Sequence, residues 1–88
     1  MSQPIATMKI SRAACHGNTP TSGDETFLVN GSPIMTVGDT FTSCYHGVPV
    51  ISQGSSVLVV NGQPVGYHGC SATFTTVNGG DATVLVPE

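Results

Sequence analysis

Three histidines and three cysteines are the residues of this 88-residue chain whose side chains could do chemistry together. A glycine follows each histidine and a cysteine lies within two positions of it; the histidines are His16, His46 and His68. Imidazole nitrogens and thiolates are ligands that Zn²⁺ prefers, usually four in a tetrahedron when the ion is structural. We therefore predict one structural Zn²⁺, bound by one imidazole from each His-Gly step and one thiolate.

The residues alone leave the identity of the cysteine open. Cys70 follows its histidine by two positions and Cys44 precedes its histidine by two, so on an extended strand each pair faces one side. Cys15 adjoins its histidine and would face the opposite way. Cys70 and Cys44 are therefore close rivals, with Cys15 third.

Four protein ligands would leave no open position for the water that a catalytic zinc site keeps. The acidic residues that could act as a general base adjoin glycines, as turn residues do; they are Asp24, Asp39 and Asp81. No Ser-His-Asp spacing and no phosphate-binding glycine loop occurs in the chain. We expect no enzymatic activity. Two alternatives stay open: a metal-free β adhesion or virion-decoration domain, and a small zinc hydrolase.

Charge and size restrict the partners. Lys9 and Arg12 are the only fixed cations, too few to neutralise the phosphates of a nucleic acid or to hold the chain on an anionic membrane. Only 8% of the residues are charged, against roughly a quarter in an ordinary soluble domain. We expect one domain, residues 1–88, whose surface is covered by a partner or by a compact neutral shell of Thr, Ser, Asn and Gly, and we favour the partner.

The ends and apolar runs bear on where the chain is made. Residues 1–10 contain no apolar core of signal-peptide length, and the longest apolar run, residues 57–60, is far too short to span a bilayer. We expect synthesis in the cytoplasm and export by a route that needs no cleavable signal. An odd number of cysteines in such a protein favours metal binding over a disulfide framework.

An internal repeat positions these residues. Residues 27–34 and 58–65 align with apolar residues, Asn-Gly and Pro in register at an offset of 31. A third His-Gly step leads to the apolar run at residues 83–86, and there the unit stops. Its missing piece resembles the start of the chain, since Gln3-Pro4-Ile5 matches Gln63-Pro64-Val65. The sequence therefore indicates three similar units, circularly shifted along the chain.

Each unit is predicted to be a β-hairpin. Asn30-Gly31 and Asn61-Gly62 lie between apolar runs and suit a type I′ turn, in which both central residues have positive φ. Pro33 and Pro64 follow at once, which places the return strands at an edge. The predicted fold is all-β: a small cone of short β-hairpins with pseudo-three-fold repeats, little or no helix, and zinc near the apex. The three His-Gly steps are expected to converge near the axis.

These residues resemble the PAAR-repeat family. Residues 33–39, Pro-Ile-Met-Thr-Val-Gly-Asp, are similar to its Pro-Ala-Ala-Arg-x-Gly-Asp segment, and residues 29–33 to its Val-x-Asn-Gly-x-Pro lead-in. Residues 64–69 occupy the second copy and residues 4–7 a worn first copy. The literal tetrapeptide is absent from all three copies, so the resemblance depends on Asn-Gly-x-Pro, Gly-Asp and the His-Gly phase together.

The resemblance implies a zinc near the apex bound by His16, His46, His68 and Cys70; only the family analogy selects Cys70 over Cys44. It also implies a partner, the trimeric β-helical spike of a type VI secretion system (valine-glycine-repeat or VgrG-like) or of a contractile phage tail. One copy would cap each trimer and touch a membrane only as the spike pierces it. The apolar residues that either face this spike or form the core are not separated by the sequence; candidates are Val57, Val59, Val84 and Val86. Which machine uses the chain, which cell it targets and whether an effector rides on the tip are left open.

Overall fold

The described chain consists of short strands joined by turns and irregular segments. The computed structural model describes residues 2–87, and within them there are nine strands and no helix. No described segment is therefore a helix that could cross a membrane. The strands are β1 (Ser2–Ile5), β2 (Arg12–Ala13), β3 (Asp24–Val29), β4 (Ser32–Ile34), β5 (Val59–Val60), β6 (Gln63–Pro64), β7 (Ser71–Ala72), β8 (Thr75–Asn78) and β9 (Asp81–Pro87). The all-β prediction is confirmed.

Three antiparallel strand pairs repeat around the molecule: β3–β4, β5–β6 and β9–β1. The first two are hairpins that turn at Asn30-Gly31 and Asn61-Gly62, where both asparagines and both glycines have positive φ. The third pair joins the two ends of the chain, with Gln3 opposite Val86. This pairing confirms that the third repeat is split between the termini.

Two closed rings of backbone hydrogen bonds lock the three units together. Ala6 N–H donates to Gly66 C=O (3.0 Å), Gly66 N–H to Met35 C=O (2.8 Å), and Met35 N–H to Ala6 C=O (2.9 Å). The second ring runs between the units in the opposite direction, from donors two residues later to acceptors two residues earlier. Its three bonds are each 2.9 Å: Met8 N–H to Pro33 C=O, Val37 N–H to Pro64 C=O, and His68 N–H to Pro4 C=O. A cycle in which each unit donates to the next is what a pseudo-three-fold axis requires.

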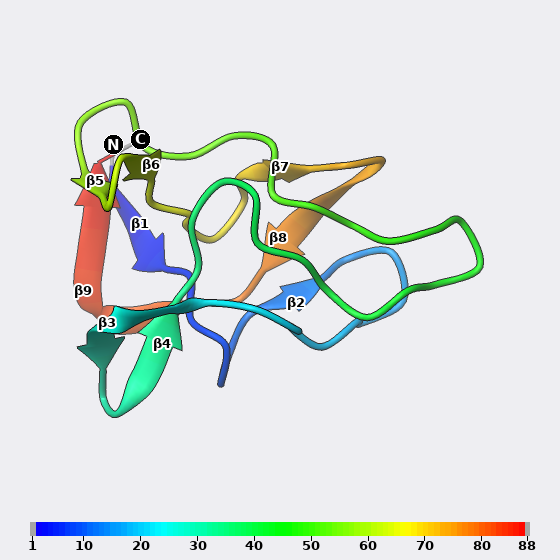
Figure 1. Ribbon diagram of the computed structural model, residues 1–88, viewed down its shortest axis with the longest axis horizontal. Coiled ribbons are helices and arrows are strands. Elements are labelled where there is room, and N and C mark those ends of the chain that lie inside the picture. The colour runs from blue at the N-terminus through cyan, green and yellow to red at the C-terminus, as the bar shows by residue number, and fades with distance from the viewer. Residues whose placement is uncertain (1, 88) are drawn as a thin grey trace.

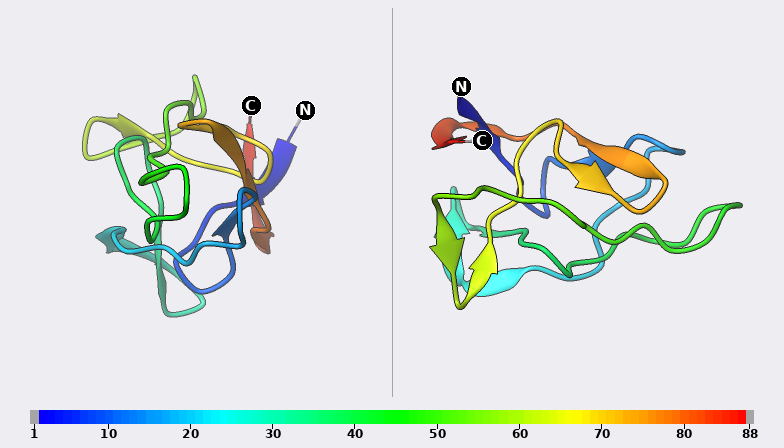
Figure 2. Two further views of the ribbon diagram at one scale, coloured as in Figure 1. Left: turned by 90° about the vertical axis from the view of Figure 1, so that its right-hand side faces the viewer. Right: turned by 90° about the horizontal axis from the view of Figure 1, so that it is seen from above.

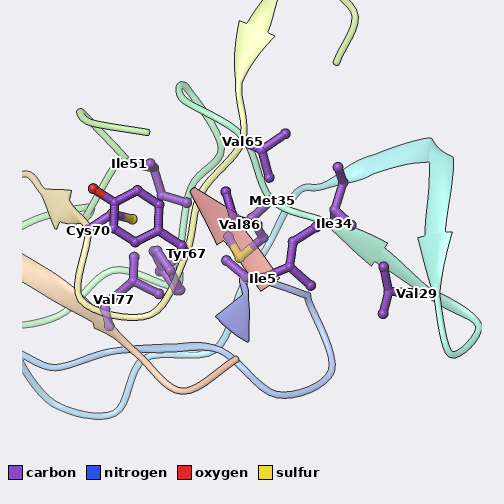
Figure 3. Close-up of a cluster of buried hydrophobic side chains, with 13 residues drawn as sticks. Ile5, Val29, Ile34, Met35, Ile51, Val65, Tyr67, Cys70, Val77 and Val86 are labelled. Carbon is purple, nitrogen blue, oxygen red and sulfur yellow. The ribbon is translucent and has the colours of Figure 1, made fainter. Parts of the chain in front are cut away.

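The apolar core lies on this axis. Ile5, Ile34 and Val65 occupy equivalent positions in the three units, and all three are fully buried. Figure 3 shows them around Met35, which fills the centre. Three short units thus share one small core, because none has enough apolar surface to form its own.

Side-chain amides link neighbouring strand pairs outside this core. Asn30 Nδ2 donates to Asp81 Oδ2 (2.7 Å), and Asn61 Nδ2 donates to Asp24 Oδ2 (2.8 Å). Each of these aspartates also accepts hydrogen bonds from the backbone N–H and the hydroxyl of the threonine two positions further on. The same polar contact therefore recurs at two of the three corners.

The molecule has a broad end and a narrow end. Its extents are 31 × 24 × 22 Å, and the three strand pairs surround the left-hand end of the long axis in Figure 1. Three hairpin turns, residues 13–18, 44–47 and 72–75, extend toward the other end, as the right-hand view of Figure 2 shows. We call the end with the strand pairs the base and the three turns the tip. The predicted tapered arrangement is thus present.

Candidate metal centre

The first tip turn is held by glycine and asparagine. Gly17 N–H donates to Ala13 C=O (2.9 Å), and Gly17 has a φ of 68°, which glycine adopts without steric cost. Asn18 Oδ1 accepts from the backbone N–H of His16 (3.1 Å), while its Nδ2 donates to the carbonyl of Thr42, just before the second tip turn (2.7 Å). Asn18 therefore fixes the turn that carries Cys15-His16 and also attaches it to the neighbouring unit.

The second tip turn is a two-residue hairpin loop. Cys44 and Gly47 exchange both backbone hydrogen bonds (2.7 and 3.0 Å), which leaves Tyr45 and His46 at the end of the loop. The backbone N–H of His46 also points to Cys44 Sγ at 3.4 Å. This geometry places the Cys44 thiol and the His46 ring on the side that faces the first turn.

The two turns bring four potential ligands together. Cys15 Sγ lies 3.3 Å from Cys44 Sγ, 3.1 Å from His16 Nδ1 and 3.3 Å from His46 Nδ1. One ligand atom from each of the four residues lies within 4.8 Å of the others. Ligands about 2.0–2.3 Å from a tetrahedral Zn²⁺ are about 3.3–3.8 Å apart, so little movement separates this group from a closed site. The two-sulfur, two-nitrogen set also suits zinc chemically.

The two thiols differ in acidity. Burial raises the pKa of Cys44, but hydrogen bonds from the His16 side chain, the His46 backbone N–H and the Cys15 thiol outweigh it and lower the pKa to about 6. For Cys15 the hydrogen bond with Cys44, together with burial and the Cys44 charge, raises the pKa above its usual value. The pair therefore favours one thiolate and one thiol, and a cation that enters would displace the second proton.

The group is accessible from solvent. Both histidines are exposed and both cysteines are half-buried. An open cleft of about 330 Å³ lies beside them, lined by residues 16–19 at the first tip turn and 42–45 at the second. An ion can therefore reach the ligands without any opening of the fold.

The family assignment follows from comparison with known proteins. A family model described as the PAAR motif matches residues 11–80, which is most of the chain. The chain belongs to the PAAR-motif family. No curated protein matches the sequence. Membership implies a structural protein of the spike tip in secretion or phage machines, as the resemblance of the repeats indicated.

The structure of this PAAR-motif chain brings together only part of the predicted ligand set. His16 and His46 are in the group, whereas His68 and Cys70 are not. The backbone N–H of His68 belongs to the second hydrogen-bond ring, and its Nδ1 accepts from Gly79 N–H (2.9 Å). Cys70 is fully buried in the core. The geometry therefore gathers Cys15 and Cys44 in their place.

The third His-Gly step marks a different turn from the other two. His68 occupies the ring position that Val37 holds in the preceding unit, and Gly69 (φ 91°) repeats Gly38 (φ 98°). The third tip turn instead carries Phe74, whose ring lies 5.9 Å from that of His46. One sequence signal separates the two kinds of step: a cysteine precedes His-Gly in residues 15–17 and 44–47, but not in residues 68–69.

Four protein ligands would fill a tetrahedral site and leave no position for a reacting water. Residues 13–23 and 40–80, which contain all three tip turns, include no Asp, Glu, Lys or Arg. The tip thus lacks the carboxylate that hydrolytic zinc sites use as general base. The chemistry that the arrangement supports is structural: an ion here would join the first tip turn to the second.

Proposed function

We propose that this chain is the non-enzymatic, zinc-stabilised tip of a contractile injection spike, and that its base caps the blunt end of a trimeric β-helical spike protein. The spike is either the valine-glycine-repeat protein of type VI secretion or the central spike of a phage tail. One chain would cap one trimer, be made in the cytoplasm, and leave the cell on the spike.

The observation that carries this proposal is an apolar triad on the base. Leu28, Val59 and Leu85 are equivalent residues, each opposite a proline of the paired strand, and they are 54%, 51% and 57% exposed. A β-strand turns alternate side chains to opposite faces, so each triad residue points outward while the next residue faces the core. Those next residues are Val29, Val60 and Val86.

Three equally exposed residues around a pseudo-three-fold axis suit a partner with true three-fold symmetry. Each chain of a trimer would meet one member of the triad, and burial contributes about 25 cal/mol per Å² of apolar surface. Phe27 and Val57, 38% and 71% exposed, enlarge the apolar surface on β3 and before β5. Of the apolar candidates from the sequence, Val57 and Val59 therefore serve the docking surface, while buried Val86 and half-buried Val84 serve the core.

Zinc is the ion we propose for the four-residue group at the opposite end. The ion would be held by Cys15, His16, Cys44 and His46, and it would cross-link the first and second tip turns, which extend beyond the core. Structural zinc contributes on the order of 10 kcal/mol to the folding of small metal-binding peptides. Such a cross-link would let a narrow tip keep its shape under load.

The surface of the tip supports brief contact with a bilayer. Its turns contain no charged residue, and moving a charge into the apolar region of a bilayer is costly. Tyr45 and Phe74 are 94% and 48% exposed, and aromatic rings are favoured at the membrane–water interface. A neutral tip would therefore enter a membrane at lower cost than an ordinary charged surface.

The test combines metal analysis with binding to a spike. Purified protein washed with a weak chelator should hold about one zinc per chain, and native mass spectrometry with a trimeric β-helical spike fragment from the same genome should show one chain per trimer. A folded protein that carries zinc but never binds the trimer would contradict the capping role. A folded protein that contains no zinc would contradict the metal role and favour a metal-free β adhesion domain.

A further inference from the structure

We propose that Cys15 and Cys44 form a disulfide when the tip meets an oxidant, so that the first and second tip turns are joined either by a metal ion or by a covalent bond. The disulfide itself follows from the positions of the two thiols. Its competition with zinc rests on the proposed function.

The two sulfur atoms are already close. They are 3.3 Å apart, and a disulfide bond is about 2.05 Å long, so closure needs a movement of only about 1.3 Å. Both cysteines belong to tip turns and lie outside the apolar core; both are half-buried, and Cys44 lines the open cleft. A small disulfide oxidant can therefore reach either sulfur.

The third cysteine leaves the pairing unambiguous. Cys70 is fully buried in the core and lies outside the tip group, so neither an oxidant nor another thiol has access to it. An odd number of cysteines in the sequence argued against a disulfide framework. The structure divides the three into one adjacent pair and one isolated thiol.

The reaction is an ordinary thiol–disulfide exchange with a low-molecular-weight disulfide. One cysteine, as thiolate, attacks a sulfur of the oxidant, breaks its S–S bond and releases one thiolate product. The second cysteine, as thiolate, then attacks the mixed disulfide, forms the Cys15–Cys44 bond and releases the other product. Two electrons pass to the oxidant, and the two thiol protons end on its two released thiols.

The consequence is that metal and disulfide exclude each other. Oxidation removes both thiolates from the four-residue group and leaves only His16 and His46, too few to hold a structural zinc. Reducing cytosol favours the thiols, whereas a periplasm or cell exterior favours the disulfide. A spike tip passes from the cytosol to a periplasm or cell exterior during delivery, so its first and second tip turns would stay joined after zinc is lost.

The experiment counts thiols. Metal-free protein is incubated with excess oxidised glutathione, denatured, alkylated with N-ethylmaleimide and weighed by mass spectrometry. We expect one alkyl group, on Cys70, against three in reduced protein. Zinc-loaded protein, treated in the same way and followed with a chromogenic chelator, should release one zinc for each pair of thiols lost; this arm decides the matter if the metal-free chain does not stay folded.

Matched variants locate the bond. Cys70→Ala should accept no alkyl group after oxidation, whereas Cys15→Ser and Cys44→Ser should form no intramolecular disulfide and instead accumulate a single glutathione adduct. Three alkylated thiols after full equilibration, a disulfide that persists in Cys15→Ser, or a covalent dimer would each overturn the proposal. None of these outcomes affects spike binding or the zinc content before oxidation, so the proposed function is tested separately.

Discussion

The imidazole rings of His16 and His46 lie nearly parallel, with their centroids 5.6 Å apart and 17° between their planes, although they come from successive repeats. Two exposed rings gain little from such an arrangement alone. Here it directs a nitrogen of each toward the Cys15 thiol, at 3.1 and 3.3 Å. The stacking therefore keeps both rings where they could bind one ion together with Cys15.

Substitution of the ligands should separate the structural set from the one expected from the sequence. His46→Ala should reduce bound zinc from about one per chain to near zero and lower the free energy of unfolding by more than about 4 kcal/mol, because loss of a structural metal is among the most severe single changes. Cys44→Ser should do the same. Zinc content by atomic emission and thermal unfolding report the two effects.

The matched control is His68→Ala. It removes the acceptor of the Gly79 hydrogen bond, which should cost about 1–3 kcal/mol, yet the zinc content should stay at about one per chain. Zinc loss in His68→Ala with retention in Cys44→Ser would show instead that the ion sits with the third His-Gly step.

Charge placed on the base triad should weaken spike binding without unfolding the chain. Leu28→Asp, Val59→Asp and Leu85→Asp each put a carboxylate on a half-exposed surface position, where the folded monomer tolerates it but a buried interface does not. We expect at least about a tenfold loss of affinity for each, equivalent to about 1.4 kcal/mol, measured by calorimetry or biolayer interferometry.

Val48→Asp is the control for this series. Val48 is 48% exposed and directly follows the second tip turn, which lies at the end of the molecule opposite the base (Figure 2). Its substitution should leave spike affinity unchanged. Equal losses for Val48→Asp and Leu28→Asp would mean that the base is not the docking surface.

Gly54 and Gly80 should be intolerant of a methyl group. A Cβ on Gly54 would lie 2.8–2.9 Å from Pro64, and one on Gly80 would lie 2.7–2.8 Å from the carbonyl oxygens of Pro4 and Ile5. Because the obstructing atoms are mostly backbone, Gly54→Ala and Gly80→Ala should each destabilise the protein by about 1–3 kcal/mol. Chemical denaturation measures the loss, and Ser56→Ala, at an exposed position, should change stability by less than about 0.5 kcal/mol.

Acid should weaken the polar contacts between strand pairs. A hydrogen bond from the Thr26 hydroxyl, with further bonds from the Thr26 N–H and Asn61, holds the pKa of Asp24 below its usual 3.8; the Thr83 hydroxyl and N–H and Asn30 do the same to the pKa of Asp81. A carboxyl whose pKa is lower when folded stabilises the protein above its unfolded pKa, and that stability disappears as pH falls through the folded value.

The double variant Asp24→Asn, Asp81→Asn should therefore be less stable than the parent at pH 7, and the difference should shrink as pH is lowered below about 4. Parallel denaturation curves from pH 7 to pH 2 give the comparison, and loss of metal at low pH affects both proteins alike. Glu25→Gln, which removes one negative charge at the neighbouring position, is the control for the change in net charge. A gap that stays constant down to pH 2 would argue against this role of the aspartates.

Much of the architecture follows from short-range signals. Asn30-Gly31 and Asn61-Gly62 specify tight turns through two adjacent residues, so their hairpins are predictable from the chain alone. The likeness of Gln3-Pro4-Ile5 to residues 63–65 likewise predicted that the two ends of the chain would complete a third pair. Local turn chemistry and repetition leave few alternatives at these positions.

The sequence by itself thus determined the all-β fold, the three repeats and two of the four residues at the candidate metal site, His16 and His46. Only the tertiary structure decided that Cys15 and Cys44 complete that group, while His68 lies outside it and Cys70 is buried in the core. The physical reason is that a His-Gly step fits both a tip turn and a turn beside the core. Which of these it occupies depends on the closed hydrogen-bond rings among residues far apart in the chain, such as Ala6 and Gly66, and no short stretch of sequence specifies that register.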